Sequence, residues 1–398
     1  MPSAPEAAQG REKLLTILDP GMAQTFGHHY AYNTALLPAG RAAGFTASCL
    51  VSRHFPRELL AGVPGAVPVF EKNFYTELAR AQGSAQALKE TAEDFAHALA
   101  KSPARNLGAG DILFAHSFDA ARILGTALWY KEAGNDVPAL ALNAMLGFNG
   151  RDDCRKTLAA ACALLSPCKK TRLFGGTRAV AAILSDLCGK ACAMLPSPLP
   201  DKLEGYRSQP ERGPLFGILG DGRKGKNLHL LAPTILRYLS QGGRGGFVLQ
   251  LTPTDEEATP HLLALHDVAA RFPARVNLNF ERLDDDAYFR QLGTLSAIIL
   301  PYGAETYHRY RPSGLVVEAT AMGVPLIAHK GGFAEDETSG LNNGSVLLED
   351  MSVGSLLTGL RLFAEESGRR RALGAEAAPA YSAGHGAGTV IKKLLPLG

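Results

Sequence analysis

The chain has 398 residues, of which 46% are hydrophobic and 20% charged, and its formal net charge at pH 7 is +3. This length fits two domains of about 150–200 residues each, with the composition of an ordinary globular protein. The small net charge and the lack of a long basic run argue against a nucleic-acid-binding protein. The chain has no run of about 18 apolar residues, so no membrane-spanning helix is predicted.

The start of the chain and its cysteines bear on where the protein works. Residues 1–13 are polar and lack the apolar core of a secretion signal, which predicts a cytoplasmic protein. Peripheral contact with the inner face of the membrane stays open, although the basic segments 131–135 and 168–172 also fit a solvated surface. The six cysteines show no CxxC spacing, which predicts reduced thiols and no metal site.

The first half of the chain alternates short apolar runs with amphipathic stretches. The apolar runs predict strands at 13–19, 45–52, 111–116 and 137–143, and helical patterns cover 72–101 and 117–135. Such an alternation is typical of a parallel sheet with helices on both faces.

The second half repeats this pattern, with predicted strands at 214–220, 245–252, 274–280, 296–302, 324–329 and 344–349. A linker rich in proline and polar residues covers 195–214. We therefore expect an α/β protein with two doubly wound domains, 1–200 and 201–382, and a C-terminal helix at 383–398 that packs back on the first domain. Ligands of such sheets bind beyond the carboxyl ends of the strands, so the site is expected between the halves.

A basic loop follows the first strand of the second half. It carries Arg223 and Lys226 and leads into a helix predicted to begin near Asn227. Cations beside free backbone N–H groups can hold an anion, so this loop is a candidate phosphate site, with a solvated basic loop as the alternative. The Walker pattern and GxGxxG are absent here, so neither an ATPase nor a dinucleotide fingerprint is indicated.

A second segment, YRPSGLVVEATAMGVPLIA, contains one carboxylate, Glu318, in apolar surroundings. Ser313 suits the N-cap of a helix, whose first turn, at Gly314 and Leu315, would offer N–H groups to an anion. An ionised carboxylate in such a place needs a partner. The partner is either a vicinal diol, as in a ribose, or a backbone group or arginine of the protein.

The two segments together resemble the donor-binding domain of the GT-B glycosyltransferases, specifically the retaining family-four enzymes (glycosyl transferases group 1). The motifs are G-x-x-R-x-x-K at 220–226 and S-G-L-V-V-E-A-x-A-x-G-V-P-L-I-A at 313–328. The resemblance implies two Rossmann-like domains that face a deep cleft. It also implies that Arg223 and Lys226 bind the donor diphosphate and that Glu318 binds the nucleotide ribose.

The sequence departs from this family at one position. Many members carry a first glutamate, which contacts the donor sugar, eight positions before the glutamate that corresponds to Glu318. In this chain that position is Tyr310. We interpret the change as altered sugar recognition, with loss of activity as the alternative. Tyr310 and Arg311 are therefore candidates for sugar or phosphate contacts.

His116 is the catalytic candidate in the first half. It ends the strand at 111–116, so its side chain is expected near the cleft. The segment resembles the family pattern D-I-V-x-A-H, which implies a histidine near the donor sugar. The alternative is a histidine bonded to a backbone carbonyl at the sheet edge.

The segment after the first strand is a candidate loop for the acceptor or the phosphates. Gly27, His28 and His29 stand where the family has a glycine-rich turn, although the glycine pair of many members is missing. Adjacent side chains on a helix point in different directions, so at most one histidine is expected in the chemistry. Asn143 is a further candidate in a later cleft loop.

The acidic stretch LDDDAYFRQL at 283–292 resembles a cluster of metal-binding carboxylates. Acidic residues at the start of a helix also complement the helix dipole, and we favour that interpretation. The resemblance implies an enzyme without metal or cofactor, because cations and a helix N-terminus stabilise the leaving diphosphate.

The predicted function is transfer of a hexosyl-type sugar from a nucleoside diphosphate sugar to a hydroxyl of a carbohydrate or glycoconjugate acceptor, in glycan or polysaccharide biosynthesis. The resemblance implies retention of the anomeric configuration. An inverting enzyme would need a general base, and His28 or His29 would be the first candidates. A GT-B nucleotide-sugar epimerase and a non-catalytic GT-B protein that binds a nucleotide sugar or a partner transferase are the alternatives. The sequence predicts neither the donor base and sugar nor the acceptor and oligomeric state.

Overall fold

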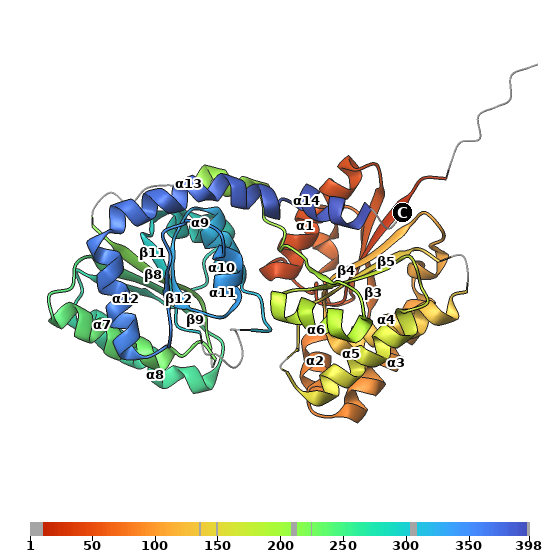
Figure 1. The fold of residues 1–398 in the computed structure, drawn as a ribbon, viewed down its shortest axis with the longest axis horizontal. Helices are drawn as coiled ribbons and strands as arrows, with labels where there is room; N and C mark the ends of the chain where they lie inside the picture. The colour runs from red at the N-terminus through yellow and green to blue at the C-terminus, as the bar shows by residue number, and fades with distance from the viewer. Residues whose placement is uncertain are drawn as a thin grey trace, which may run out of the picture.

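The computed structural model describes residues 11–134, 137–148, 150–207, 213–223, 225–302 and 309–395. It contains two parallel sheets, of seven and six strands, each in its own lobe. Figure 1 shows the lobes side by side, the N-terminal lobe in red to yellow and the C-terminal lobe in green to blue. The predicted α/β architecture is confirmed.

The first sheet has the strand order β3-β2-β1-β4-β5-β6-β7, and all its pairs are parallel. Its strands are β1 (Leu14–Asp19), β2 (Thr46–Ser52), β3 (Ala66–Phe70), β4 (Ile112–Phe118), β5 (Ala139–Ala144), β6 (Thr171–Gly175) and β7 (Ala193–Met194). The sequence pattern did not predict β3, β6 and β7. These strands lie toward the two ends of the sheet, and they are short or interrupted by Pro68 and Arg172, so they lack a continuous apolar run.

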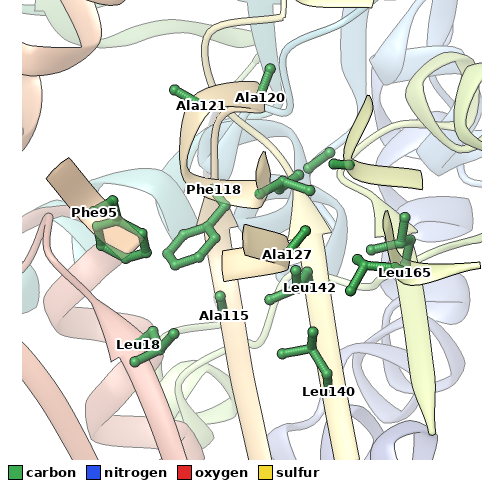
Figure 2. Close-up of a cluster of buried hydrophobic side chains, with 14 of the residues drawn as sticks. Leu18, Phe95, Ala115, Phe118, Ala120, Ala121, Ala127, Leu140, Leu142 and Leu165 are labelled. Atoms are coloured by element: carbon green, nitrogen blue, oxygen red, sulfur yellow. The ribbon is translucent and has the colours of Figure 1, made fainter. Parts of the chain in front are cut away.

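Helices pack on both faces of this sheet. They are α1 (Gly27–Ala42), α2 (Phe74–Ala81), α3 (Ala85–Lys101), α4 (Ala120–Glu132), α5 (Asp152–Leu165) and α6 (Arg178–Cys188). The single helical pattern predicted at 72–101 is two helices, because Ser84 caps a new helix by accepting a hydrogen bond from the Ala87 N–H. Figure 2 shows the core on one face, where Phe118 of β4 points toward Phe95 of α3 with ring centroids 5.4 Å apart.

The second sheet has the order β10-β9-β8-β11-β12-β13, which is the strand order of a Rossmann fold. All six strands were predicted: β8 (Leu215–Gly222), β9 (Gly246–Pro253), β10 (Val276–Asn279), β11 (Ala297–Leu300), β12 (Leu326–His329) and β13 (Val346–Leu348). The helices are α7 (Leu231–Ser240), α8 (Thr259–Arg271), α9 (Asp285–Thr294), α10 (Gly314–Ala321), α11 (Phe333–Thr338) and α12 (Val353–Glu365).

The end of the chain joins the lobes. Helix α13 (Ser367–His385) runs from the second lobe toward the first, and α14 (Ala387–Leu394) lies beside α1 (Figure 1). Val390 and Ile391 of α14 are buried in one apolar cluster with Leu36 and Leu37 of α1. The polypeptide of the second lobe thus completes the core of the first.

Three segments for which the sequence made predictions extend beyond the described residues. Within the linker expected at 195–214, residues 208–212 lie outside them, as do residues 1–10 of the polar start and 396–398 of the C-terminal helix. In the part that is described, no helix combines the length and the apolar character that crossing a membrane requires.

Candidate functional site

The loops that follow the strands of one sheet meet those of the other. Three contacts between the lobes show this arrangement: the Arg282 guanidinium 4.5 Å above the Phe26 ring, the Tyr310 ring 5.1 Å from the Phe148 ring, and the hydrogen bond of 2.8 Å from Thr177 Oγ1 to the Arg309 carbonyl. The carboxyl ends of both sheets therefore face each other, at the place where α/β folds bind ligands.

The basic loop after β8 lies at this facing edge. Lys226 is only 7% exposed, and a Cβ atom at Gly220 would lie 3.2 Å from its Nζ atom. Burial, followed by the charge of Arg223, lowers the pKa of Lys226 to about 8. The loop is longer than predicted, because Asn227 has a left-handed φ of 48° and the regular helix α7 begins only at Leu231. A buried cation next to an arginine is an arrangement that an anion would stabilise.

Glu318 lies on α10, and its partner is a tyrosine of α9. The Tyr288 hydroxyl donates a hydrogen bond of 2.6 Å to Glu318 Oε2. Burial raises the pKa of Glu318, and the bond from Tyr288 opposes that rise. Among the described residues no arginine or backbone N–H bonds to this carboxylate, so the partner is neither of the two protein groups that the sequence suggested.

Ser313 occupies the N-cap position of α10, as predicted, but its side chain caps no backbone N–H group. Its Oγ atom lies 3.4 Å from the Tyr302 hydroxyl instead. Tyr302, Ser313 and His329 line a cavity of about 10 Å³ between the head of α10 and the ends of β11 and β12. This space fits about one water molecule. Gly314 and Leu315 begin the helix beside it, so the first-turn N–H groups lie at the facing edge.

Tyr310 and Arg311 have different surroundings. The Tyr310 ring packs on Phe148 of the first lobe, and a Cβ atom at Gly150 would come within 3.2 Å of it. Tyr310, in the place of the family's first glutamate, is thus part of the contact between the lobes. Arg311 lies across from Tyr75 of α2. Burial and Asp19 raise the pKa of Tyr75 to about 12, against the opposing charges of Arg311 and Arg223.

A buried carboxylate, Asp19, ends β1 and was not predicted as a site residue. Asp19 Oδ1 lies 2.6 Å from His29 Nδ1, and Asp19 Oδ2 lies 3.3 Å from His116 Nε2. Burial alone would raise the pKa of Asp19, but the charges and hydrogen bonds of the two histidines hold it well below its usual range. Asp19 is the last residue of β1, whereas β4 continues two residues past His116, to Phe118, and does not end at 116 as predicted. The place of Asp19 at a strand end was the signal that could have revealed it.

The ligand atoms of Asp19, His29 and His116 lie within 4.8 Å of one another, as three protein ligands of a transition metal would. The carboxylate, however, already accepts hydrogen bonds from the Gly21 N–H and the Asn33 amide and faces both imidazoles. These contacts use its acceptor positions. The carboxylate is thus satisfied by protein groups, whereas both ring nitrogens of the buried His29 lack a well-aligned hydrogen bond among the described residues. The absence of a metal site stays a prediction.

The imidazole of His116 points into the first lobe. Its Nδ1 atom lies 2.7 Å from Ser117 Oγ, and its Nε2 atom lies 3.3 Å from both Asp19 Oδ2 and Asn33 Oδ1. Asn143 donates a hydrogen bond of 2.8 Å to the His116 carbonyl. The structure thus brings His116 and Asn143 to the expected edge, where internal partners hold their side chains.

His28 and His29 lie closer together than predicted, with ring centroids 4.0 Å apart. Both stand in the first turn of α1, which begins at Gly27 with a φ of 80°. His29 is buried against Asp19, whereas His28 is half-buried, and its pKa is lowered mainly by burial and then by His29. The glycine that this cluster requires is Gly21, where a Cβ atom would lie 2.2 Å from the His29 ring.

Comparisons with known proteins identify the fold of the chain. No family model matches the chain, and no curated protein matches it. Several solved structures match along nearly the whole length. HepE from Anabaena in complex with UDP is 13% identical, with 96% of this chain and 98% of that one covered and a TM-score of 0.66. Sucrose-phosphate synthase from Thermosynechococcus elongatus is 12% identical, with 97% and 98% covered and a TM-score of 0.66.

A third match is the N-terminal domain of trehalose-6-phosphate phosphatase from Candida albicans, at 11% identity, 99% and 98% coverage and a TM-score of 0.71. These neighbours include GT-B glycosyltransferases. The chain has the GT-B fold. Its two sheets are the two Rossmann-like domains of a GT-B protein, and Arg223, Lys226 and Glu318 all belong to the second one. At 11 to 13% identity the likeness shows the fold alone, so the activity is argued from the site.

Proposed function

We propose that this GT-B protein is a glycosyltransferase that uses a nucleoside diphosphate sugar as donor. The observation that supports this most directly is the grouping of a buried lysine, an arginine and a carboxylate bonded by one tyrosine around the carboxyl edge of the second sheet. Lys226 and Arg223 follow β8, and Glu318 lies on α10, which follows β11. A diphosphate and a ribose would need these groups.

Each group has a role in the proposed transfer. Lys226, Arg223 and the first-turn N–H groups of α10 would stabilise the negative charge that develops on the leaving diphosphate. Glu318 would accept a hydrogen bond from the ribose and so fix the position of the sugar. The structures of HepE in complex with UDP and with UDP-glucose support this class of ligand for the fold.

The acceptor belongs to the first lobe in this proposal. His28 and Tyr75 lie on that side, opposite Arg311. A hydroxyl of a carbohydrate or glycoconjugate bound there would attack the anomeric carbon of the donor. We propose that the reaction proceeds without metal or other cofactor, because the cationic loop neutralises the diphosphate, and that it retains the anomeric configuration, as the resemblance implies.

Two observations favour a second candidate, a GT-B protein that binds a nucleotide sugar without turnover. Tyr310 stands where the family has its first glutamate and packs against Phe148. The imidazole nitrogens of His116, the expected catalytic group, face Ser117 and Asp19. Without a glutamate at position 310, or with the His116 imidazole turned toward Ser117 and Asp19, the site would lack a group that contacts the donor sugar in the family.

Release of the nucleoside diphosphate separates the two candidates. The purified protein is incubated with UDP-, GDP- and ADP-sugars and a panel of saccharide acceptors, with EDTA present. A transferase releases nucleoside diphosphate at a rate that depends on the acceptor and that Lys226→Met abolishes. Donor binding without release in the presence of any acceptor would establish the binding protein.

A further inference from the structure

The hydrogen bond between Tyr288 and Glu318 has a defined direction. Burial and then the nearby charge of Glu318 hold the pKa of Tyr288 well above its usual range, so the phenol keeps its proton. Tyr288 is therefore the donor and Glu318 Oε2 the acceptor, over 2.6 Å. The two residues lie on α9 and α10, which are separate helices of the second lobe, so the bond joins the two helices.

This bond leaves one oxygen of the carboxylate open. Oε1 lies on the side of Gly314, 3.5 Å from the position that a Cβ atom there would occupy. Among the described residues no other group bonds to the Glu318 carboxylate, and the residue is half-buried. The open oxygen thus faces the first residue of α10, and the glycine at that residue leaves room beside it.

We propose that Tyr288 is a positioning residue for the donor: it holds Oε2 of Glu318 so that Oε1 accepts a hydrogen bond from a ribose hydroxyl of the nucleotide. The proposal rests on the proposed function. It gives a physical reason for a tyrosine at this point, because a carboxylate among apolar groups needs a donor to remain ionised before the nucleotide arrives. It also fixes the carboxylate's rotation, so that binding does not have to order it.

A matched control is a second tyrosine that bonds to a carboxylate of the same helix, α9. The Tyr206 hydroxyl donates to Asp286 of α9, so this is also a tyrosine–carboxylate bond between separate elements. The Asp286 side chain stands in the exposed first turn of α9, two residues before Tyr288. Tyr206→Phe therefore removes the same kind of bond without touching Glu318.

The test measures the dissociation constants of UDP, GDP and ADP by titration calorimetry for wild type, Tyr288→Phe and Tyr206→Phe, across a series of pH values. Tyr288→Phe should bind about tenfold more weakly at neutral pH, as expected for the loss of one hydrogen bond to a charged group. As the pH is lowered, Tyr288→Phe should also begin to lose affinity at a higher pH than wild type does. The reason is that the tyrosine bond lowers the pKa of Glu318, so its removal lets the carboxylate take up a proton, and lose its acceptor capacity, at higher pH. Tyr206→Phe should match wild type in both respects.

The outcomes separate this proposal from the function on which it rests. If wild type binds a nucleotide and Tyr288→Phe shows the same affinity and pH profile, the positioning role is wrong and the donor site stands. If both tyrosine variants weaken binding equally with no change in pH profile, Tyr288 acts only through general stability, and the proposal fails. If wild type binds none of the three nucleotides, the proposed function and this role fail together.

Discussion

At the scale of single residues, the charge of Lys226 depends most strongly on its surroundings. Its side chain is almost fully buried, Arg223 is close, and its ammonium lies 5.9 Å from the centre of the Tyr302 ring. Burial with a like charge nearby favours the neutral amine. In the proposed donor site, a diphosphate would supply the negative charge that restores the ammonium.

This environment predicts a pH dependence of binding. With a pKa of about 8, Lys226 is protonated below that pH and neutral above it, so the affinity for a nucleoside diphosphate should fall as the pH rises through 8. Lys226→Arg keeps its charge throughout this range and should abolish the alkaline loss. Lys226→Met should bind weakly at every pH. Calorimetric titrations across the range test this, and an alkaline loss that persists in Lys226→Arg would exclude Lys226 as its source.

The site residues differ in how far the sequence could predict them. Lys226 and Glu318 belong to local sequence motifs. Each motif follows a predicted strand of the second half, so the sequence alone places both residues at the carboxyl edge of the second sheet. Asp19 belongs to the site only because the fold brings His29 and His116 to it, and a lone aspartate at the end of a strand shows no such pattern in the sequence. Tyr288 is separated from Glu318 by 30 positions and lies on another helix, so no periodicity links them.

At the scale of elements, the second sheet was predictable because most of its strands contain an apolar run between glycine, proline or polar residues, and β10 alternates apolar and polar residues. The first sheet was predicted at its centre and missed toward its ends. Strand β7 has two residues and β3 contains a proline, so pairing with a neighbouring strand, and not the local sequence, makes them strands.

Helix α14 is the element whose loss should affect the first lobe most clearly. Val390 is fully buried between α14 and α1. Val390→Asp places an unpaired carboxylate there, and we expect it to lower the free energy of unfolding by about 3 kcal/mol or more. Lys392→Asp changes an exposed position in the last turn of the same helix and should lower it by less than about 1 kcal/mol, since only the interaction with the helix dipole is reversed. Urea denaturation measures both, and equal effects would show that α14 does not belong to the core of the first lobe.

At the scale of the whole molecule, the two lobes touch directly through the loops that carry the candidate site. Phe26, Phe148 and Thr177 of the first lobe meet Arg282, Tyr310 and Arg309 of the second. A donor between the lobes would be enclosed by these contacts and kept from water, which limits hydrolysis as a competing reaction. Helix α13 and the segment around Leu199 connect the lobes on another side, where the Leu199 N–H donates to the His385 carbonyl over 3.0 Å.

Thermal unfolding with a panel of nucleoside diphosphates tests whether Glu318 forms part of a nucleotide site. A nucleotide at 100 times its dissociation constant should add about 2.7 kcal/mol of apparent stability to wild type. Glu318→Ala should lose most of this shift. Glu337→Ala, which removes another buried glutamate bonded to a tyrosine, should lower the starting melting temperature and keep the shift. Equal shifts in wild type and Glu318→Ala, or no shift with any nucleotide, would show that Glu318 does not bind a nucleotide.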